Sequence, residues 1–207
     1  MVKEVSQVIS LVSASRQGKT KERRHRLVEA VVELINEGGF DSLSPQLIAM
    51  RSGLSVTAVK NFGSNNELCE AVFSECQASF LALLNNEALL EGTIRERSQL
   101  FVSLSWYHYK SDIYSATIEM FLAKRRREDM YSSVRLSKCQ VIGYLKIARK
   151  IFAECELDDR EFLEALRAVH CFLTGLALEN VVKPDLSNIG GYLRMCTRAM
   201  AAMLENN

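Results

Sequence analysis

Helix-breaking residues are scarce in this chain, and their scarcity restricts its possible folds more than any other feature. The 207 residues include two prolines, Pro45 and Pro184, and 10 glycines. Proline interrupts a helix and glycine weakens one, so long stretches without either favour helices. The sequence also lacks hairpin turns and convincing runs of alternating apolar and polar residues. It therefore predicts an all-α fold.

Apolar spacing and capping residues place the individual helices. Between residues 19 and 37 an apolar stripe recurs every three to four positions, and a glycine pair follows it. Ser44 and Pro45 are favoured at the start of a helix, and Gly53 is suited to end one. The expected helices span about 19–37, 45–52, 56–61, 65–85, 93–109, 112–127, 129–154, 158–182 and 187–205.

Residues 46–62 have the spacing of a helix-turn-helix motif. Ala49 is small enough for a second helix to approach closely, and four positions later Gly53 can adopt the left-handed conformation of a sharp turn. Apolar residues that would hold the two helices together are Ile48, Leu54, Val59 and Phe62. The second helix would be barely two turns long, and with its apolar positions facing inward it would expose Val56, Thr57, Lys60 and Asn61.

A short helix with polar side chains outward fits the major groove of DNA, where its first residues reach base edges. The segment just before the motif is basic. It carries six cations and one acid, Glu22, so its net charge is 6 − 1 = +5, and such a segment is suited to phosphate contacts. The six cations are Arg16, Lys19, Lys21, Arg23, Arg24 and Arg26. Two helices joined by a glycine turn also occur in proteins that bind no DNA, and this alternative stays open.

These features resemble the TetR family of transcriptional regulators. The similarity runs from Arg26 through EGGFDSLSPQLIAMRSGLSVTAVKNF to SNNELCEAV and covers about 50 residues. The family pattern has three parts: G-[YF]-x-x-[ST]-x-x-x-IA-x-x-x-G-[VL]-S, then a short recognition helix, then F-x-x-K-x-x-L. The residues of this sequence that match it are Gly39, Phe40, Ser44, Ile48, Ala49, Gly53, Leu54, Ser55, Phe62 and Leu68.

The sequence departs from this pattern at two phosphate-contacting positions. The recognition helix is one residue short, so that either Lys60 or Val59 takes the place of the usual tyrosine. We prefer Lys60, because this assignment keeps Val59 inside. Asn65 replaces the lysine that usually begins the fourth helix. By the resemblance, the expected DNA-binding residues are Ser44, Gln46, Ser55, Val56, Thr57, Lys60, Asn61, Arg16, Lys19 and Lys21.

The resemblance implies three parts: a flexible basic arm over 1–18, a DNA-binding domain over 19–66, and a ligand-binding and dimerisation domain over 67–207. It also implies a homodimer that pairs through about 158–205 and a palindromic operator. A small-molecule effector would release the DNA, and repression would be the usual output. The aromatic segment 101–121 supplies candidate effector contacts, although core packing is the commoner role of any single aromatic residue. The candidates are Trp106, Tyr107, His108, Tyr109, Tyr114 and Met120.

Several other classes of protein find little support in the sequence. The net charge of +1 provides no global attraction to nucleic acids or membranes, and no apolar run reaches membrane-spanning length. Motifs of nucleotide-binding enzymes, hydrolases and zinc proteases are absent, so we expect no catalysis, no cofactor and no metal. The six cysteines lack zinc-site spacing and are expected to be reduced, mostly buried thiols of a cytoplasmic protein, with no redox sensor among them identifiable. The main alternative function is a helical protein-interaction module that binds no specific DNA.

Overall fold

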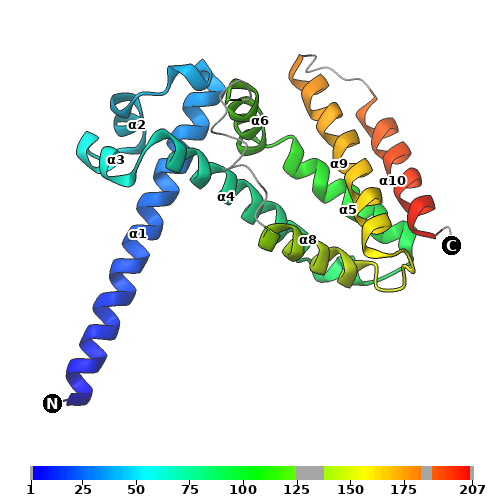
Figure 1. The fold of residues 1–207 in the computed structure, drawn as a ribbon, viewed down its shortest axis with the longest axis horizontal. Helices are drawn as coiled ribbons and strands as arrows, with labels where there is room; N and C mark the ends of the chain where they lie inside the picture. Colours follow the sequence, from blue (N-terminus) through cyan, green and yellow to red (C-terminus); the bar gives the residue numbers. More distant parts are fainter. Residues whose placement is uncertain (1, 125–137, 183–187, 206–207) are drawn as a thin grey trace. The chain divides into compact units, whose positions relative to one another are not determined.

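The computed structural model of the chain describes residues 2–124, 138–182 and 188–205. Within these residues every regular element is helical and none is a strand, which confirms the predicted all-α fold (Figure 1). The elements are α1 (Val2–Gly38), η1 (Phe40–Ser42), α2 (Pro45–Ser52), α3 (Val56–Phe62), α4 (Asn65–Leu84), η2 (Glu87–Leu90), α5 (Ile94–Tyr109), α6 (Asp112–Lys124), α8 (Lys138–Ile151), α9 (Asp159–Val182) and α10 (Ile189–Glu205). The parts of the expected helices that fall at 125–137 and 183–187 lie outside the described residues.

The chain forms two compact units. The first unit contains Met1–Glu75 and Ala116–Arg126, and the second contains Cys76–Ser115 and Arg127–Asn207. The boundary between the units therefore falls inside α4, and a second crossing falls inside α6. The sequence, in contrast, places a single boundary between residues 66 and 67, at the start of α4.

The first unit is built around the C-terminal half of α1. Figure 1 shows α2 and α3 beside this half of the helix. From Leu27 onward α1 is buried along one face, and Ile48 of α2 and Val59 of α3 are buried with it. The apolar spacing that predicts these helices thus also identifies the core that fixes the orientation of α3.

The N-terminal segment, for which the sequence predicts a flexible basic arm over residues 1–18, is continuous with the first helix of the structure. In the structure the backbone is helical without interruption from Val2 to Gly38. The exposed residues Lys21, Arg23 and Arg24 therefore belong to the same helix as the buried residues that begin at Leu27.

The turn between α2 and α3 depends on Gly53. Its φ angle is +65°, and its backbone N–H donates to the carbonyl oxygen of Ala49. Arg26 lies against the same turn, where its Nε donates to the carbonyl oxygen of Ser52 over 3.0 Å. A Cβ atom at position 53 would lie 2.7 Å from Nη2 of Arg26. Glycine therefore meets two requirements: the left-handed conformation and the space for the guanidinium group.

We expect Gly53→Ala to lower the free energy of unfolding by about 2 kcal/mol, because a non-glycine residue in the left-handed region costs about 1–2 kcal/mol and Arg26 would also be displaced. Urea unfolding followed by circular dichroism measures the change. Met50→Ala, one turn earlier on α2 and at an exposed position, is the control and should be within about 0.5 kcal/mol of the parent. Equal stability of the Gly53→Ala protein would contradict this account of the turn.

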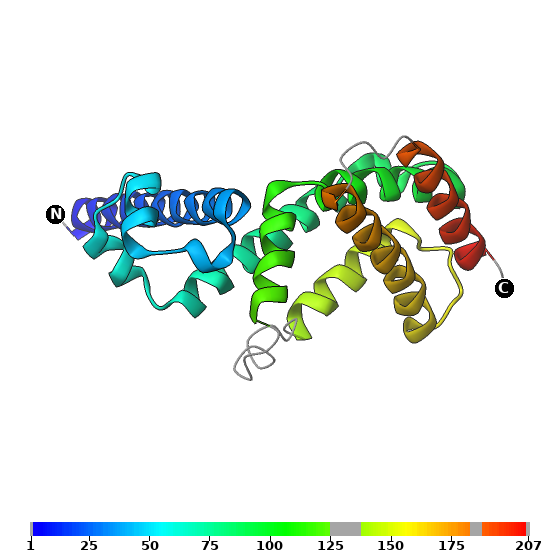
Figure 2. The same cartoon turned by 90° about the horizontal axis from the view of Figure 1, so that it is seen from above.

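The second unit packs around α5. This helix contacts both α9 and α10, which lie side by side (Figure 2, orange and red). Phe101, Phe152 and Phe162 are fully buried and contact one another edge to face, with ring centroids 5.9 and 6.5 Å apart in the two pairs. Arg149 secures the α8–α9 connection: its guanidinium group lies over the Phe162 ring and donates to the carbonyl oxygen of Leu157 over 2.7 Å.

Candidate nucleic-acid interface and aromatic cluster

The outer face of α3 is polar and exposed. Ser55, the N-cap residue, accepts a hydrogen bond from the backbone N–H of Ala58 over 3.1 Å, which begins the helix cleanly. Val59 is 2% exposed and anchors the inner face, while Thr57, Lys60 and Asn61 are exposed. The structure thus agrees with the preferred register, in which Lys60 faces outward and Val59 inward. Val56, at the first turn, is half-buried.

Two further candidates lie at the start of α2. The Ser44 side chain caps this helix and accepts a hydrogen bond from the backbone N–H of Leu47 over 3.3 Å. Gln46 is exposed in the first turn. These residues and those of α3 all belong to the first unit, on the two helices of the motif.

The basic residues before the motif have different roles in the structure. Lys21, Arg23 and Arg24 are exposed and available to a ligand, whereas Arg26 is half-buried and holds the carbonyl oxygen of Ser52. The side chains of Arg16 and Lys19, both predicted to bind DNA, lie outside the described part of the structure. The sequence alone groups Arg26 with the other cations.

The start of α4 is closed by its own side chains. The Glu67 carboxylate accepts hydrogen bonds from the Ser64 backbone N–H over 2.7 Å and from the Ser64 hydroxyl over 3.1 Å. Both bonds hold the pKa of Glu67 below its usual value. A helix start normally attracts anions, but here the Glu67 carboxylate already accepts the Ser64 N–H, and the Ser64 hydroxyl oxygen accepts the Glu67 N–H over 3.4 Å. With Asn65 in place of lysine, this end of α4 offers DNA no cation of its own.

The second unit contains a largely buried group of aromatic residues, here called the aromatic cluster: Phe80, His108, Tyr109, Tyr114 and Tyr144. The Phe80 ring stacks on His108 with centroids 4.9 Å apart. Tyr109 and Tyr114 lie 4.5 Å apart, and Tyr144 lies 5.9 Å from Phe80. The cluster brings together helices α4, α5, α6 and α8, which no local sequence pattern connects.

Hydrogen bonds pair polar atoms within and around the aromatic cluster. The Cys76 Sγ atom lies 3.6 Å from Nε2 of His108, and the Tyr114 hydroxyl lies 2.7 Å from Oγ1 of Thr174 on α9. The Tyr109 hydroxyl contacts Nδ1 of His170. Burial lowers the pKa of His108 to about 4 and raises the pKa of Tyr114 to about 12. These groups are therefore uncharged at neutral pH.

The six candidate effector contacts lie in different environments in the structure. His108, Tyr109 and Tyr114 belong to the aromatic cluster, and Trp106 is buried on the same helix as the first two. Tyr107 is 62% exposed, with its ring 5.7 Å from Nζ of Lys110. Met120 is buried but belongs to the first unit. Sequence reasoning missed Phe80, Tyr144 and Thr174 as neighbours of the cluster, because their contacts join residues far apart in the chain.

We expect protonation of His108 to destabilise the protein in acid. Its folded-state pKa of about 4 lies below the ordinary value of 6.5, so the unfolded chain takes up the proton first. Stability is then fully present above pH 6.5 and falls by up to roughly 3 kcal/mol as the pH drops toward 4. Urea titrations between pH 7 and pH 4 should show a shallower loss for His108→Phe than for the parent. His25→Gln, at an exposed position, should reproduce the parent profile. Parallel profiles for His108→Phe and the parent would contradict the expectation.

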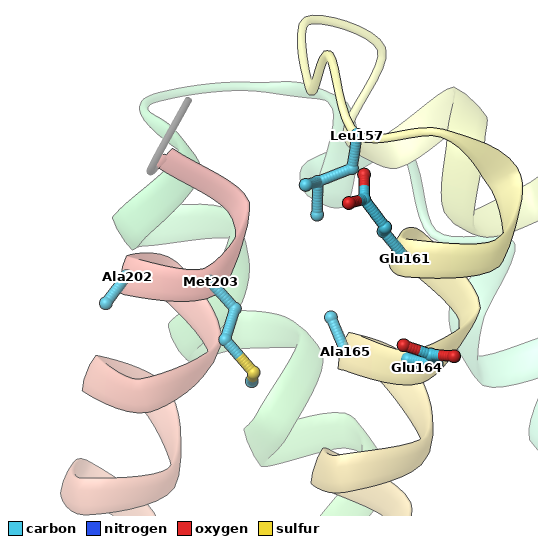
Figure 3. Close-up of a pocket in the computed structure, with 6 residues that line it drawn as sticks. All are labelled: Leu157, Glu161, Glu164, Ala165, Ala202 and Met203. Carbon is cyan, nitrogen blue, oxygen red and sulfur yellow. The ribbon is translucent and has the colours of Figure 1, made fainter.

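An open pocket of about 480 Å³ lies between α9 and α10 (Figure 3). None of the candidate effector contacts lines it. Its two carboxylates already have partners, because Glu161 accepts from the backbone N–H of Asp158 and Glu164 pairs with Arg160. The lining residues are Leu157, Glu161, Glu164, Ala165, Ala202 and Met203.

The described residues contain neither a candidate metal site nor a disulfide. No group of three or more His, Cys, Asp or Glu side chains among them could hold a metal ion. The described cysteines are free thiols: Cys69, Cys76, Cys155 and Cys196 are buried, and Cys171 is exposed.

A three-helix motif unit followed by a helical body is the architecture of TetR-family transcriptional regulators, and solved structures confirm the likeness. The TetR-family regulator PfmR from Thermus thermophilus is 19% identical, with a TM-score of 0.57 over 87% of this chain and 97% of that one. A transcriptional regulator from Rhodococcus sp. Rha1 is 17% identical, with a TM-score of 0.66 over 87% and 95%. The multidrug-binding protein EbrR, complexed with imidazole, is 17% identical, with a TM-score of 0.58 over 86% and 89%.

These similarities span nearly the whole of each chain and establish the TetR-type fold that the sequence resemblance predicts. No family model and no curated protein sequence matches the chain.

Proposed function

We propose that this protein is a DNA-binding transcriptional regulator of the TetR type. The observation that carries the proposal is the exposed polar face of α3, where Thr57, Lys60 and Asn61 stand over the buried Val59. A two-turn helix held in this way can enter the major groove. An asparagine side chain suits adenine, and a lysine suits guanine or a phosphate group. The protein would then act in the cytoplasm, on chromosomal DNA.

A homodimer is part of the proposal, because α9 and α10 expose more apolar surface than a monomer needs. The α9 helix is apolar enough to meet the length and composition of a membrane span, yet much of its surface is exposed in the described residues. Gly175, in mid-helix on an exposed face, has no atom within 4 Å of where a Cβ would lie, which leaves space for a second helix. The large exposed apolar residues of the two helices are Phe172, Leu178, Val181, Val182, Tyr192 and Met195. Pairing of this face with a second copy would give two reading helices and a palindromic operator.

An effector-controlled response completes the proposal. EbrR, which shares the fold, is a multidrug-binding protein in complex with imidazole. In this chain the aromatic cluster gathers largely buried rings and a few polar groups, which is the composition of most small-molecule sites. Binding of an effector to one conformation would weaken operator binding, and the operator would weaken effector binding by the same factor. Repression that the effector relieves is the output we propose.

Selection of bound sequences from a random DNA pool tests the function directly. The purified protein is incubated with the pool at physiological salt, and bound DNA is sequenced over several rounds. Enrichment of a palindrome is the expected result. Binding without enrichment, weak and strongly dependent on salt, would contradict a specific regulator and favour a helical protein-interaction module instead.

A further inference from the structure

The turn between α2 and α3 is short and contains the residue type with the most backbone freedom. Only residues 53–55 separate the end of α2 at Ser52 from the start of α3 at Val56. Gly53 adopts the left-handed conformation that this turn needs, but glycine also has the widest choice of backbone angles. The direction of α3 therefore depends on what restrains the peptide groups on either side of Gly53.

Two carbonyl oxygens restrain this turn. The oxygen of Ala49 accepts the backbone N–H groups of Gly53 and Leu54, the latter over 3.2 Å, which closes the turn from within α2. The oxygen of Ser52 is one of the last carbonyls of α2, which no N–H group of the helix itself can reach. It accepts from Arg26 instead, from Nε over 3.0 Å and from Nη2 over 2.5 Å. The second restraint thus comes from α1.

The paired donors of Arg26 act on a whole peptide group. The Ser52 carbonyl belongs to the planar peptide that joins Ser52 to Gly53, so holding its oxygen restricts the rotation of this plane. A guanidinium group is flat and presents its N–H groups in a fixed fork, whereas the ammonium group of lysine is a single charge that rotates on a flexible stem. A lysine at position 26 would keep the charge and lose the defined orientation.

A small rotation at this turn would have a large effect on the exposed face of α3. Val59 is the buried residue of this seven-residue helix, so packing anchors the helix mainly near its middle. Asn61 lies five residues beyond Val56, about 7.5 Å along the helix axis, and a rotation of about 10° at the turn would displace it by about 1 Å. Donor–acceptor distances of hydrogen bonds vary by only about 0.5 Å. Contacts with base edges would therefore be lost.

We propose that Arg26 is a positioning residue of the helix-turn-helix motif: it restrains the peptide between Ser52 and Gly53 and thereby directs α3 toward the bases of the operator. Its effect is on sequence discrimination, while the exposed Arg23 and Arg24 remain available to phosphate groups. This role rests on the proposed DNA-binding function. The restraint on the turn is a property of the folded chain and can be measured without DNA.

Arg26→Lys tests the proposal, because it keeps the charge and removes the paired donors. Fluorescence anisotropy measures the affinity for the selected operator and for a duplex of scrambled sequence at several salt concentrations. The ratio of the two affinities should fall about tenfold, as after the loss of one base contact. The affinity for the scrambled duplex and its salt dependence should stay as in the parent, since the number of cations is unchanged. Arg24→Lys, the same substitution at an exposed position, is the control and should leave the ratio unchanged.

The ratio of affinities separates positioning from two other roles of Arg26. A loss of folded protein would lower both affinities by the same factor. A phosphate contact, which lysine can also make, would survive the substitution on both duplexes. An unchanged ratio in Arg26→Lys would therefore overturn the proposal.

NMR relaxation of the Gly53 amide tests the restraint in the free, full-length protein. Its order parameter should be about 0.85 in the parent, the value of a rigid backbone, and clearly lower in Arg26→Lys. Arg24→Lys should match the parent. An equally rigid Gly53 in Arg26→Lys would show that Arg26 does not restrain the turn, and would also overturn the proposal. A random pool without an enriched sequence would refute the proposed function instead, and a mobile Gly53 in Arg26→Lys would then still assign the restraint to Arg26.

Discussion

Replacement of both Lys60 and Asn61 by alanine is expected to weaken binding to the selected operator by roughly 30-fold or more. Each contact with a base edge contributes about 1–3 kcal/mol of discrimination, and the two side chains are the best suited on α3 to make one. Both residues are exposed, so their truncation removes no core contact and the protein should fold as before. Fluorescence anisotropy with a labelled operator duplex measures the affinity, and circular dichroism checks the fold.

The charge lost with Lys60 requires a matched control. Lys146→Ala removes one exposed lysine from α8 in the second unit and should change operator affinity by less than twofold. A second comparison uses a duplex of scrambled sequence. The affinities of the parent and the double variant for this duplex should differ far less than their affinities for the operator. Operator affinity that survives the double substitution would show that α3 does not read the sequence, and the protein-interaction alternative would then gain support.

Glutamates introduced at Leu178 and Val181 should convert the proposed dimer into a monomer and thereby abolish tight operator binding. Leu178 is 43% exposed and Val181 is 65% exposed, so neither substitution disturbs the core of the second unit. In a dimer both would be covered by apolar surface, where an unpaired carboxylate costs several kcal/mol. Four such charges in one symmetric interface should weaken association more than 100-fold, because each substitution is present twice. Analytical ultracentrifugation over a range of concentrations measures the change.

Leu90→Glu is the matched control for this prediction. It places the same charge at a similarly exposed leucine of η2, in the same unit but outside α9 and α10. The control protein should sediment as the parent does and bind the operator equally well. A dimer that survives both glutamates would place the subunit interface elsewhere on the molecule. A parent protein that sediments as a monomer at all concentrations would rule out the dimer altogether.

The sequence predicted local structure well because local structure depends on neighbouring residues. Ser44, Ser55 and Thr93 each cap the helix that follows them, and all three helix starts agree with the expected ones within a residue or two. The exposed face of α3 was also predictable, because a buried Val59 decides which side chains of a two-turn helix face outward.

Contacts between distant segments were not predictable in this way. Arg26 looks like one more cation of a basic run, yet it holds the carbonyl oxygen of Ser52, 26 residues later. Glu119 lies 79 residues from Phe40, and Tyr109 lies 61 residues from His170. Tyr107 lies in the same aromatic segment as the buried Tyr109, but its position around the axis of α5 directs its side chain toward solvent. Which way each side chain points and which residues it contacts depend on how the helices rotate and pack against one another. A short stretch of sequence contains no information about either.

The closed start of α4 has a consequence for how the proposed regulator would respond to its ionic surroundings. The affinity of a protein for DNA falls as the salt concentration rises, because binding releases the counterions of the phosphates that it contacts. On a double logarithmic plot, each phosphate contact adds about −0.9 to the slope. Here the Glu67 carboxylate accepts the Ser64 N–H at the start of α4, Asn65 provides no cation, and Arg26 is bonded to Ser52. Each missing phosphate contact makes the dependence of operator affinity on salt shallower. Occupancy of the operator would therefore fall less, when a cell accumulates potassium under osmotic stress, than it would with a lysine at position 65 and an unbonded Arg26.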